Sequence, residues 1–378
     1  MLCEQSSFGA RLMRVLILTA GFGDGHNTAA ANVSQALNEI TNGRADSPVY
    51  DPISLANPVM AGLLQHGYQI AITSLPKIWR FLYSKSETVD LAHPPVELFN
   101  GILDWLEIEM KRFRPSAIVS TYPLYASLIR RLDPGIPVYT IITDSITVHR
   151  SWVTTPSTLH FVTDEKSKAV AASLGLAAES VRVTGFPVAP DFARQKMSAR
   201  TQLKRLLWIC STGTSNTITT LRSLLDNLAE EISITIVLGR QEARLSGPIE
   251  RELCRHTGRR DVAVLGWCTK IPHLMATHDF ILTKAGGATT HECFASGIPM
   301  GINYVVPGQE EGNAELALSS GCAIHISKAS DTGTVIQNLV ASGKYTELAG
   351  SIAATGISDG AFRIAREIIA AQANAASS

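Results

Sequence analysis

No apolar run in this sequence approaches the roughly 18 to 20 residues that a membrane-spanning helix needs. The six cysteines show no CxxC pair and no tight spacing, so they indicate neither a zinc site nor a disulfide framework, and reduced thiols are typical of a cytosolic protein. Because 33 basic residues balance 33 acidic residues, no net charge draws the whole chain to nucleic acid. We therefore expect a cytoplasmic protein that binds no nucleic acid and contacts a membrane only peripherally.

Low-complexity linkers and short-period repeats are missing as well. One segment resembles the start of a signal peptide, because two arginines precede a short apolar run within residues 11–20. That run is only about six residues long, and polar Asp24 and His26 follow soon after it. We expect this run to form a buried first strand instead.

The rest of the sequence alternates short apolar segments with helical ones, which predicts parallel sheets covered by helices on both faces. With 378 residues and 45% hydrophobic content, the chain can bury two cores. We expect an α/β protein with two doubly wound, Rossmann-like domains, joined by a polar connection near residues 191–204. The domains are residues 1–190 and 191–357, and an apolar helix at about 358–378 packs back on the first. The expected strands are 15–19, 117–120, 138–143, 159–162 and 181–184, then 206–210, 234–238, 262–265, 280–283 and 300–303.

Ligands bind such sheets at the carboxyl ends of the strands, where several loops of this sequence converge. Gly286 and Gly287 follow one strand and precede a helix expected to begin near Thr289. Their backbone amides are therefore suited to an anion at the positive end of the helix dipole. Glu292, expected in the first turn of that helix, is placed to accept hydrogen bonds from two ribose hydroxyls. These residue types indicate a diphosphate beside a ribose.

Two further loops fit a nucleotide-sugar site. Gln309, Glu310 and Asn313 offer hydrogen-bond donors and acceptors suited to a sugar. Gly213 and Thr214 belong to a loop of small residues after a strand, which forms either a simple helix cap or further contacts to the same diphosphate.

Aromatic residues near these strand ends leave two interpretations open. Trp267 either places its indole against a flat base or packs partly buried in the domain core. Asp144, His149 and Trp152 follow the predicted strand 138–143, where they either line the site or form a capped and packed loop.

The first glycine loop, residues 21–25, is followed by a histidine. His26 stands where a dinucleotide fingerprint needs its third glycine, so NAD binding is only weakly indicated, although Asp51 follows at a plausible strand end. An imidazole at a strand-to-helix turn can act as a general base near neutral pH. Helix capping is the alternative role of His26.

Residues 60–85 interleave aromatic and basic side chains, among them Trp79, Arg80 and Phe81. Aromatic rings settle at the bilayer interface, and basic side chains are attracted to anionic headgroups. This segment therefore predicts docking on an anionic membrane surface. Amphipathic packing inside the domain is the alternative interpretation.

Together these motifs resemble a family of lipid glycosyltransferases, which includes monogalactosyldiacylglycerol synthase and the processive diacylglycerol glucosyltransferases. The peptidoglycan N-acetylglucosaminyltransferase is similar at a greater distance. The resemblance covers most of the chain, carried by residues 21–26, 120–123, 143–152, 183–187, 266–267, 283–292 and 308–313. It implies a GT-B fold with two domains facing a cleft, a UDP-sugar donor in the second domain and a membrane-lipid acceptor in the first. It also implies inversion at the anomeric carbon without a bound metal or a cofactor.

The resemblance assigns roles to single residues as well. His26 matches the histidine of the family that serves acceptor activation. The donor residues that it implies are Gly213, Thr214, Trp267, Gly286, Gly287, Thr289, Glu292, Gln309, Glu310 and Asn313, and the acceptor residues are Gly25, Asp144, His149 and Trp152. Two positions depart from the family. Ala189 stands where an arginine commonly neutralises the diphosphate, which leaves Arg240 or Lys284 to replace it, and Asp24 stands where relatives carry Gly or Asn.

We therefore expect an inverting glycosyltransferase that moves a hexose from a UDP-sugar to a membrane lipid, with diacylglycerol as the favoured acceptor. One rival is a UDP-sugar epimerase or hydrolase of the same fold. Another is a nucleotide-sugar-binding protein that has lost catalysis, which Ala189 supports and which the retention of both His26 and Glu292 opposes.

Overall fold

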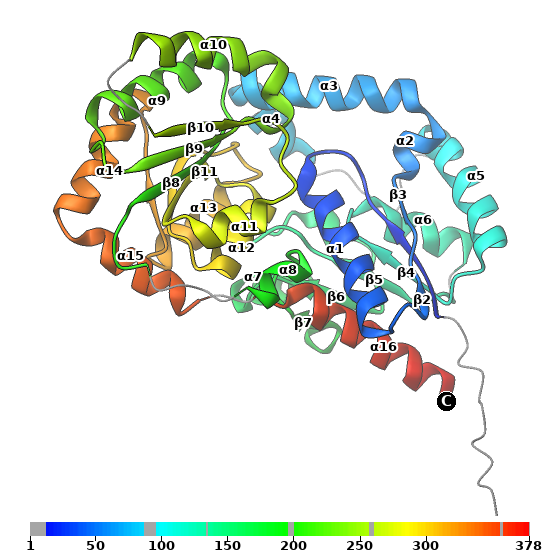
Figure 1. The fold of residues 1–378 in the computed structure, drawn as a ribbon. Helices are drawn as coiled ribbons and strands as arrows, with labels where there is room; N and C mark the ends of the chain where they lie inside the picture. Colours follow the sequence, from blue (N-terminus) through cyan, green and yellow to red (C-terminus); the bar gives the residue numbers. More distant parts are fainter. Residues whose placement is uncertain are drawn as a thin grey trace, which may run out of the picture.

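The protein is described by a computed structural model, which covers residues 13–86, 96–133, 135–195, 200–256, 261–355 and 358–377. In it the chain forms two parallel β-sheets, drawn on the right and on the left of Figure 1. Every strand pairing in both sheets is parallel, as is typical of sheets whose connections are helices. The predicted α/β architecture of two Rossmann-like domains is confirmed.

The first sheet has the strand order β2-β1-β4-β5-β6-β7, and β3 also pairs with β1. Its strands are β1 (Met13–Leu18), β2 (Ala45–Asp46), β3 (Val49–Tyr50), β4 (Ala117–Ser120), β5 (Val138–Ile141), β6 (Leu159–Val162) and β7 (Val181–Val183). The helices of this half are α1 (Asp24–Ile40), α2 (Pro52–Ala56), α3 (Pro58–Ser74), α4 (Pro76–Ser86), α5 (Val96–Phe113), α6 (Leu124–Leu132), α7 (Glu165–Ser173) and α8 (Pro190–Arg194), with short 3-10 turns η1 (Arg150–Trp152) and η2 (Ala178–Ser180).

Both faces of the first sheet are buried, which explains why β1 is apolar along its length rather than alternating. Side chains of successive strand residues point to opposite faces. Val15 and Ile17 accordingly share one core with α1 and with α16 (Gly360–Ser377), whereas Leu16 and Leu18 share another with α5 and α6.

The C-terminal helix α16 returns to the first domain, where Figure 1 shows it beside α1. Ile364 and Ile368 of α16 are fully buried against that domain. Gly360 starts the helix against the chain at Phe186, because a Cβ at this position would lie 2.2 Å from the carbonyl oxygen of Phe186. A side chain at residue 360 would therefore push the helix away from the domain.

The second sheet has the order β10-β9-β8-β11-β12-β13. Its strands are β8 (Arg205–Ile209), β9 (Ser233–Val237), β10 (Val262–Leu265), β11 (Phe280–Lys284), β12 (Met300–Tyr304) and β13 (Ala323–His325). Its helices are α9 (Thr214–Asn227), α10 (Glu242–Arg255), α11 (Ile271–Thr277), α12 (Gly287–Ser296), α13 (Glu311–Ser319), α14 (Thr332–Ala341) and α15 (Lys344–Ala353), with short 3-10 turns η3 (Gly239–Gln241) and η4 (Ala329–Asp331).

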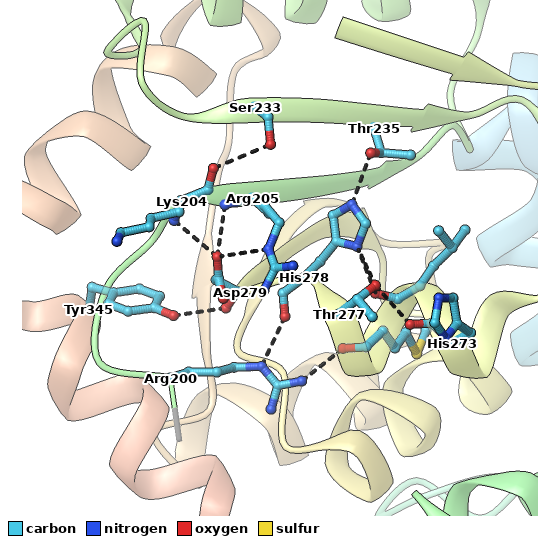
Figure 2. Close-up of polar contacts among 12 residues, drawn as sticks. Arg200, Lys204, Arg205, Ser233, Thr235, His273, Thr277, His278, Asp279 and Tyr345 are labelled. Carbon is cyan, nitrogen blue, oxygen red and sulfur yellow. Dashed lines mark hydrogen bonds and ion pairs between the residues drawn. The ribbon is translucent and has the colours of Figure 1, made fainter. Parts of the chain in front are cut away.

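Arg200, in the predicted connection between the domains, is buried against the second domain (Figure 2). The Arg200 guanidinium donates to the carbonyl oxygens of Met275, His278, Ser296 and Gly297 at 2.7 to 3.0 Å. These bonds satisfy backbone acceptors at the ends of α11 and α12, where a helix leaves its last carbonyls unpaired. The connection near residue 200 is thereby fixed to the core of the second domain.

Candidate functional site

The start of α12 forms an anion-binding backbone at the end of β11. The helix begins at Gly287, two residues before the predicted start, so Glu292 lies in its second turn and the prediction of a first-turn position was wrong. The first intrahelical bond runs from Thr290 N to Gly286 O at 2.8 Å. The amides of Gly287, Ala288 and Thr289 therefore lack an intrahelical acceptor and are suited to an anion.

The two glycines at this helix start lie close to neighbouring groups. A Cβ on Gly286 would lie 2.9 Å from Lys284 Nζ, and a Cβ on Gly287 would lie 3.3 Å from the carbonyl oxygen of Thr143 in the first domain. The Lys284 ammonium thus lies at the helix start, where it pairs with Glu310. Glu310 is buried and also accepts a hydrogen bond from Val306 N at 3.0 Å, so this carboxylate already fixes the turn before α13.

Three buried oxygens at this site have no hydrogen-bond partner among the residues that the structure describes. They are Ser211 Oγ after β8, Thr290 Oγ1 in α12 and Asn313 Oδ1 in α13. Buried polar groups are nearly always hydrogen-bonded, so each unpaired atom needs an explanation. All three come from the elements predicted to hold the donor.

Glu292 is desolvated at this site, and burial raises its pKa to about 7. A carboxyl group with such a pKa is poised between its two forms at neutral pH. Hydroxyl donors that bond to the charged form would lower the pKa again. This electrostatic setting is consistent with a ribose ligand.

Gln309 contacts the first domain directly. Tyr68 of α3 donates from Oη to Gln309 Oε1 at 2.8 Å, which fixes the orientation of the Gln309 amide. Gly308 has a φ of 79° and packs against the Tyr83 ring, so this turn requires glycine. The predicted sugar-binding turn is therefore held by α3 and α4 as well as by its own domain.

Trp267 lies on the surface with 61% of its area exposed, so the interpretation as a core residue was wrong. The guanidinium carbon of Arg240 lies 5.2 Å from the centre of its ring, which is a cation–π contact. The indole beside the predicted diphosphate loop is thus accessible to a base.

The first domain presents His26 to this region. His26 Nδ1 lies 3.2 Å from Thr143 Oγ1, and the ring contacts Tyr122 and Trp152 at centroid distances of 5.4 and 6.0 Å. Burial lowers the pKa of His26 to about 4, so the imidazole is neutral at physiological pH.

Of the predicted acceptor residues, Trp152 contacts the His26 ring and Asp144 is hydrogen-bonded to Trp152. Asp144 Oδ2 accepts hydrogen bonds from Trp152 Nε1 at 2.8 Å and from His149 N at 3.3 Å, and burial raises the pKa of Asp144. A Cβ on Gly25 would meet no atom within 4 Å, which leaves the start of α1 open. Asp51, by contrast, accepts hydrogen bonds from Gly21 N and from Ser54, so its carboxylate closes the glycine loop.

A surface of exposed apolar side chains lies next to the site, on α2 to α4. Among the described residues, 13 large apolar side chains are strongly exposed, and 10 of them fall between residues 55 and 82. We call these ten the α3–α4 surface: Leu55, Val59, Met60, Leu63, Leu64, Ile70, Leu75, Ile78, Phe81 and Leu82. Within α3 they recur at helical spacing, while Ala61, Tyr68 and Ile72 lie on the opposite, inward side.

No helix in the described part of the chain combines the length and the apolar character needed to cross a bilayer. Packing inside the domain accounts for the inward side of α3 but leaves the α3–α4 surface uncovered. Arg80, predicted to face anionic headgroups, instead pairs with Glu311 of α13 at 2.7 Å.

Three contributors to the site were missed by sequence reasoning. Thr143 touches both His26 and Gly287, Tyr122 packs on the His26 ring, and Tyr68 orients Gln309. Thr143 is the last residue of the predicted strand 138–143 and Tyr122 follows the predicted strand 117–120, which is a usable signal. Tyr68 lies 241 residues from its partner, and no local pattern could reveal that contact.

The chain is similar to known proteins in sequence and in fold. The profile of the monogalactosyldiacylglycerol (MGDG) synthase family matches residues 26–188. The chain is 26% identical over 327 residues to a processive diacylglycerol beta-glucosyltransferase of Bacillus cereus, covering 83% of this chain and 82% of the relative. A relative of the same name from Bacillus licheniformis is 25% identical over 370 residues and is covered to 94%, as is this chain.

Among solved structures, the Acinetobacter baumannii MurG has a TM-score of 0.61 at 14% identity, covering 94% of this chain and 99% of that one. The UDP-GlcNAc 2-epimerase of Neisseria meningitidis, solved with UDP-GlcNAc bound, has a TM-score of 0.62 at 15% identity, covering 94% and 100%.

The two parallel sheets and these structural likenesses define a protein of the GT-B class. The family profile over residues 26–188 and the relatives along most of the chain show what its sequence is similar to. They support the resemblance to the lipid glycosyltransferases that include MGDG synthase and the processive diacylglycerol glucosyltransferases.

Proposed function

We propose that this protein is an inverting glycosyltransferase that transfers a hexose from a UDP-sugar to the hydroxyl group of diacylglycerol in a membrane. The observation that carries the proposal is the position of Thr143. Its hydroxyl lies 3.2 Å from the His26 imidazole, and its carbonyl lies against Gly287 at the anion-binding start of α12. Thr143 therefore contacts both the proposed base for the acceptor and the proposed binding site of the leaving group.

In the proposed reaction, the acceptor oxygen attacks the anomeric carbon while the bond from that carbon to the UDP oxygen breaks. The His26 imidazole takes the hydroxyl proton. The amides at the starts of α9 and α12 stabilise the negative charge on the departing UDP. A single displacement of this kind inverts the anomeric carbon and uses neither a metal nor a cofactor.

The donor assignment is supported by the chemistry of the second domain. Glu292 suits a ribose, Trp267 offers an exposed ring for a base, and the unpaired oxygen of Asn313 lies beside the sugar-binding turn. The structurally similar Neisseria epimerase was solved with UDP-GlcNAc bound, which fits a uridine nucleotide.

The lipid acceptor is supported by the names of the relatives and by the α3–α4 surface. Exposed apolar patches of this kind mark interaction sites. We propose that this surface docks peripherally on the membrane and brings the headgroup region of the lipid to His26.

The test is product analysis after the protein is incubated with UDP-glucose or UDP-galactose and liposomes that contain diacylglycerol. A glycolipid with inverted anomeric configuration is expected. The His26→Ala variant should lower turnover by roughly 100-fold or more, the usual scale of general-base loss, with UDP affinity nearly unchanged. Free sugar or an epimerised UDP-sugar as the sole product would instead identify a hydrolase or an epimerase. Helix capping no longer explains His26, because the N-cap of α1 is Gly23 and no side chain of the described residues caps this helix. Wild-type turnover in His26→Ala would therefore show that His26 is not the base.

A further inference from the structure

Arg240 and Asp24 form an ion pair between the two domains. Arg240 Nη2 donates to Asp24 Oδ1 at 2.9 Å, and Nε donates to Oδ2 at 3.3 Å, so the guanidinium grips both carboxylate oxygens. Asp24 is the first residue of α1, two positions before His26. Both side chains are exposed, at 69% for Arg240 and 62% for Asp24. Pairs this exposed contribute little to stability and exchange readily.

The neighbours of Arg240 place it inside the predicted nucleotide site. Gln241 Nε2 donates to Cys210 O at 3.4 Å and Arg244 Nη2 donates to Thr212 O at 3.1 Å, which holds the turn η3 against the predicted diphosphate loop. The Arg240 guanidinium also lies over the Trp267 ring. Arg240 thus lies among the predicted diphosphate loop, the Trp267 ring and the first glycine loop.

Lys284, the second cation that could replace the arginine of the family, is tied more firmly. It pairs with Glu310, whose second oxygen accepts from Val306 N. Because Glu310 is buried, releasing Lys284 would leave an uncompensated carboxylate out of water, which is strongly unfavourable. Asp24, in contrast, would return to solvent when its partner leaves.

We infer that Arg240 binds the diphosphate of the donor and that Asp24 holds its guanidinium in position until the donor arrives. Carboxylate and phosphate both present two oxygens that match the planar donor fork of arginine. Donor binding exchanges the carboxylate for the diphosphate, and Arg240 supplies the cation that Ala189 lacks. This inference rests on the proposed function, because it requires a nucleoside diphosphate donor.

The experiment is calorimetric titration of wild type, Asp24→Asn, Arg240→Gln and the double variant with UDP and with uridine. Asp24→Asn removes the competing carboxylate and should tighten UDP binding by roughly three- to fivefold, the strength of an exposed ion pair. Arg240→Gln should weaken UDP binding by about tenfold or more. Uridine, which has no diphosphate, should bind equally well to all four proteins. In the double variant, the gain from Asp24→Asn should vanish.

The matched control is Arg363→Gln, which breaks an exposed ion pair with Asp359 at the start of α16 and should leave UDP binding unchanged. Wild-type UDP affinity in Arg240→Gln, or weaker UDP binding in Asp24→Asn, would overturn the inference while leaving the proposed donor intact. A wild type that binds another nucleoside diphosphate but not UDP would refute the proposed donor, and the same variants titrated with that nucleotide would still decide the role of Arg240. A wild type that binds none would refute both.

Discussion

Glu292 shows how one residue couples the donor site to pH. Burial raises its pKa from 4.5 to about 7 in the folded protein. The folded state therefore holds a proton that the unfolded state has lost between these two pH values. The stability contributed by this group is fully present below pH 4.5 and is lost as pH rises to about 7.

This linkage gives a prediction for Glu292→Gln, whose amide cannot ionise. Relative to wild type, the free energy of unfolding of the variant should rise by up to about 3 kcal/mol between pH 4 and pH 8, the equivalent of the pKa shift. Urea denaturation at several pH values measures this difference. Glu347→Gln, on the exposed surface of α15, is the control and should show a pH-independent difference. A flat profile for Glu292→Gln would mean that the carboxyl group is well solvated.

At the scale of elements, α3 and α4 have two sides with different tasks. The inward side contacts the second domain through Tyr68 and through Ile72, whose carbonyl accepts from Tyr304 Oη at 2.6 Å. The outward side is the α3–α4 surface. Because Arg80 is already paired with Glu311, we expect apolar contact to carry more of the membrane affinity than charge does.

Vesicle flotation tests this expectation. The double variant Leu63→Ser/Phe81→Ser removes side chains that are 65% and 60% exposed, and its vesicle affinity should fall by roughly tenfold or more. High salt should weaken wild-type binding less than this substitution does, since screening acts only on charge. Ile108→Ser, on α5 outside the surface and 67% exposed, is the control. Equal flotation of double variant and wild type would assign the surface another partner.

The elements also show what the sequence could and could not predict. Apolar strands such as β4 and β11, with four and five residues, were predictable because both faces of each strand are buried. The strands β2 and β3 have two residues each, too few for any periodicity, and were missed. Arg200 reads as a surface charge, since the four carbonyls that bind it lie 75 to 97 positions later in the chain.

The residues of the candidate site also divide into those that local sequence could predict and those that it could not. The glycines before α12 were predictable because a turn in which the backbone comes close to its neighbours favours a residue without a side chain. Whether Trp267 is buried or exposed depends on packing between segments, so local sequence left both interpretations open. Contacts between the domains, such as that between Asp24 and Arg240, depend on the assembled fold and had no local signal.

At the scale of the whole molecule, transfer requires the two domains to keep a fixed position relative to each other. The start of α13 packs tightly on the loop after β5, because a Cβ on Gly312 would lie 2.0 Å from Ser145 O and 2.5 Å from Thr147 Oγ1. A hydrogen bond between Ser145 Oγ and His291 Nε2, 2.8 Å apart, crosses the same junction. These contacts hold the sugar-binding turn and the His26 region at a fixed separation.

Gly312→Ala should therefore separate donor and acceptor without removing any ligand of either. The added methyl group forces the backbone apart, and a displacement of about 1 Å is enough to lower transfer by 10- to 100-fold. The UDP dissociation constant should change little, since the nucleotide ligands proposed above lie within the second domain. Gly350→Ala, in α15 with no atom within 4 Å of the new Cβ, is the control and should leave transfer unchanged. Wild-type transfer rates in Gly312→Ala would show that the domains adjust freely, and the observed junction would then have no part in aligning the reaction.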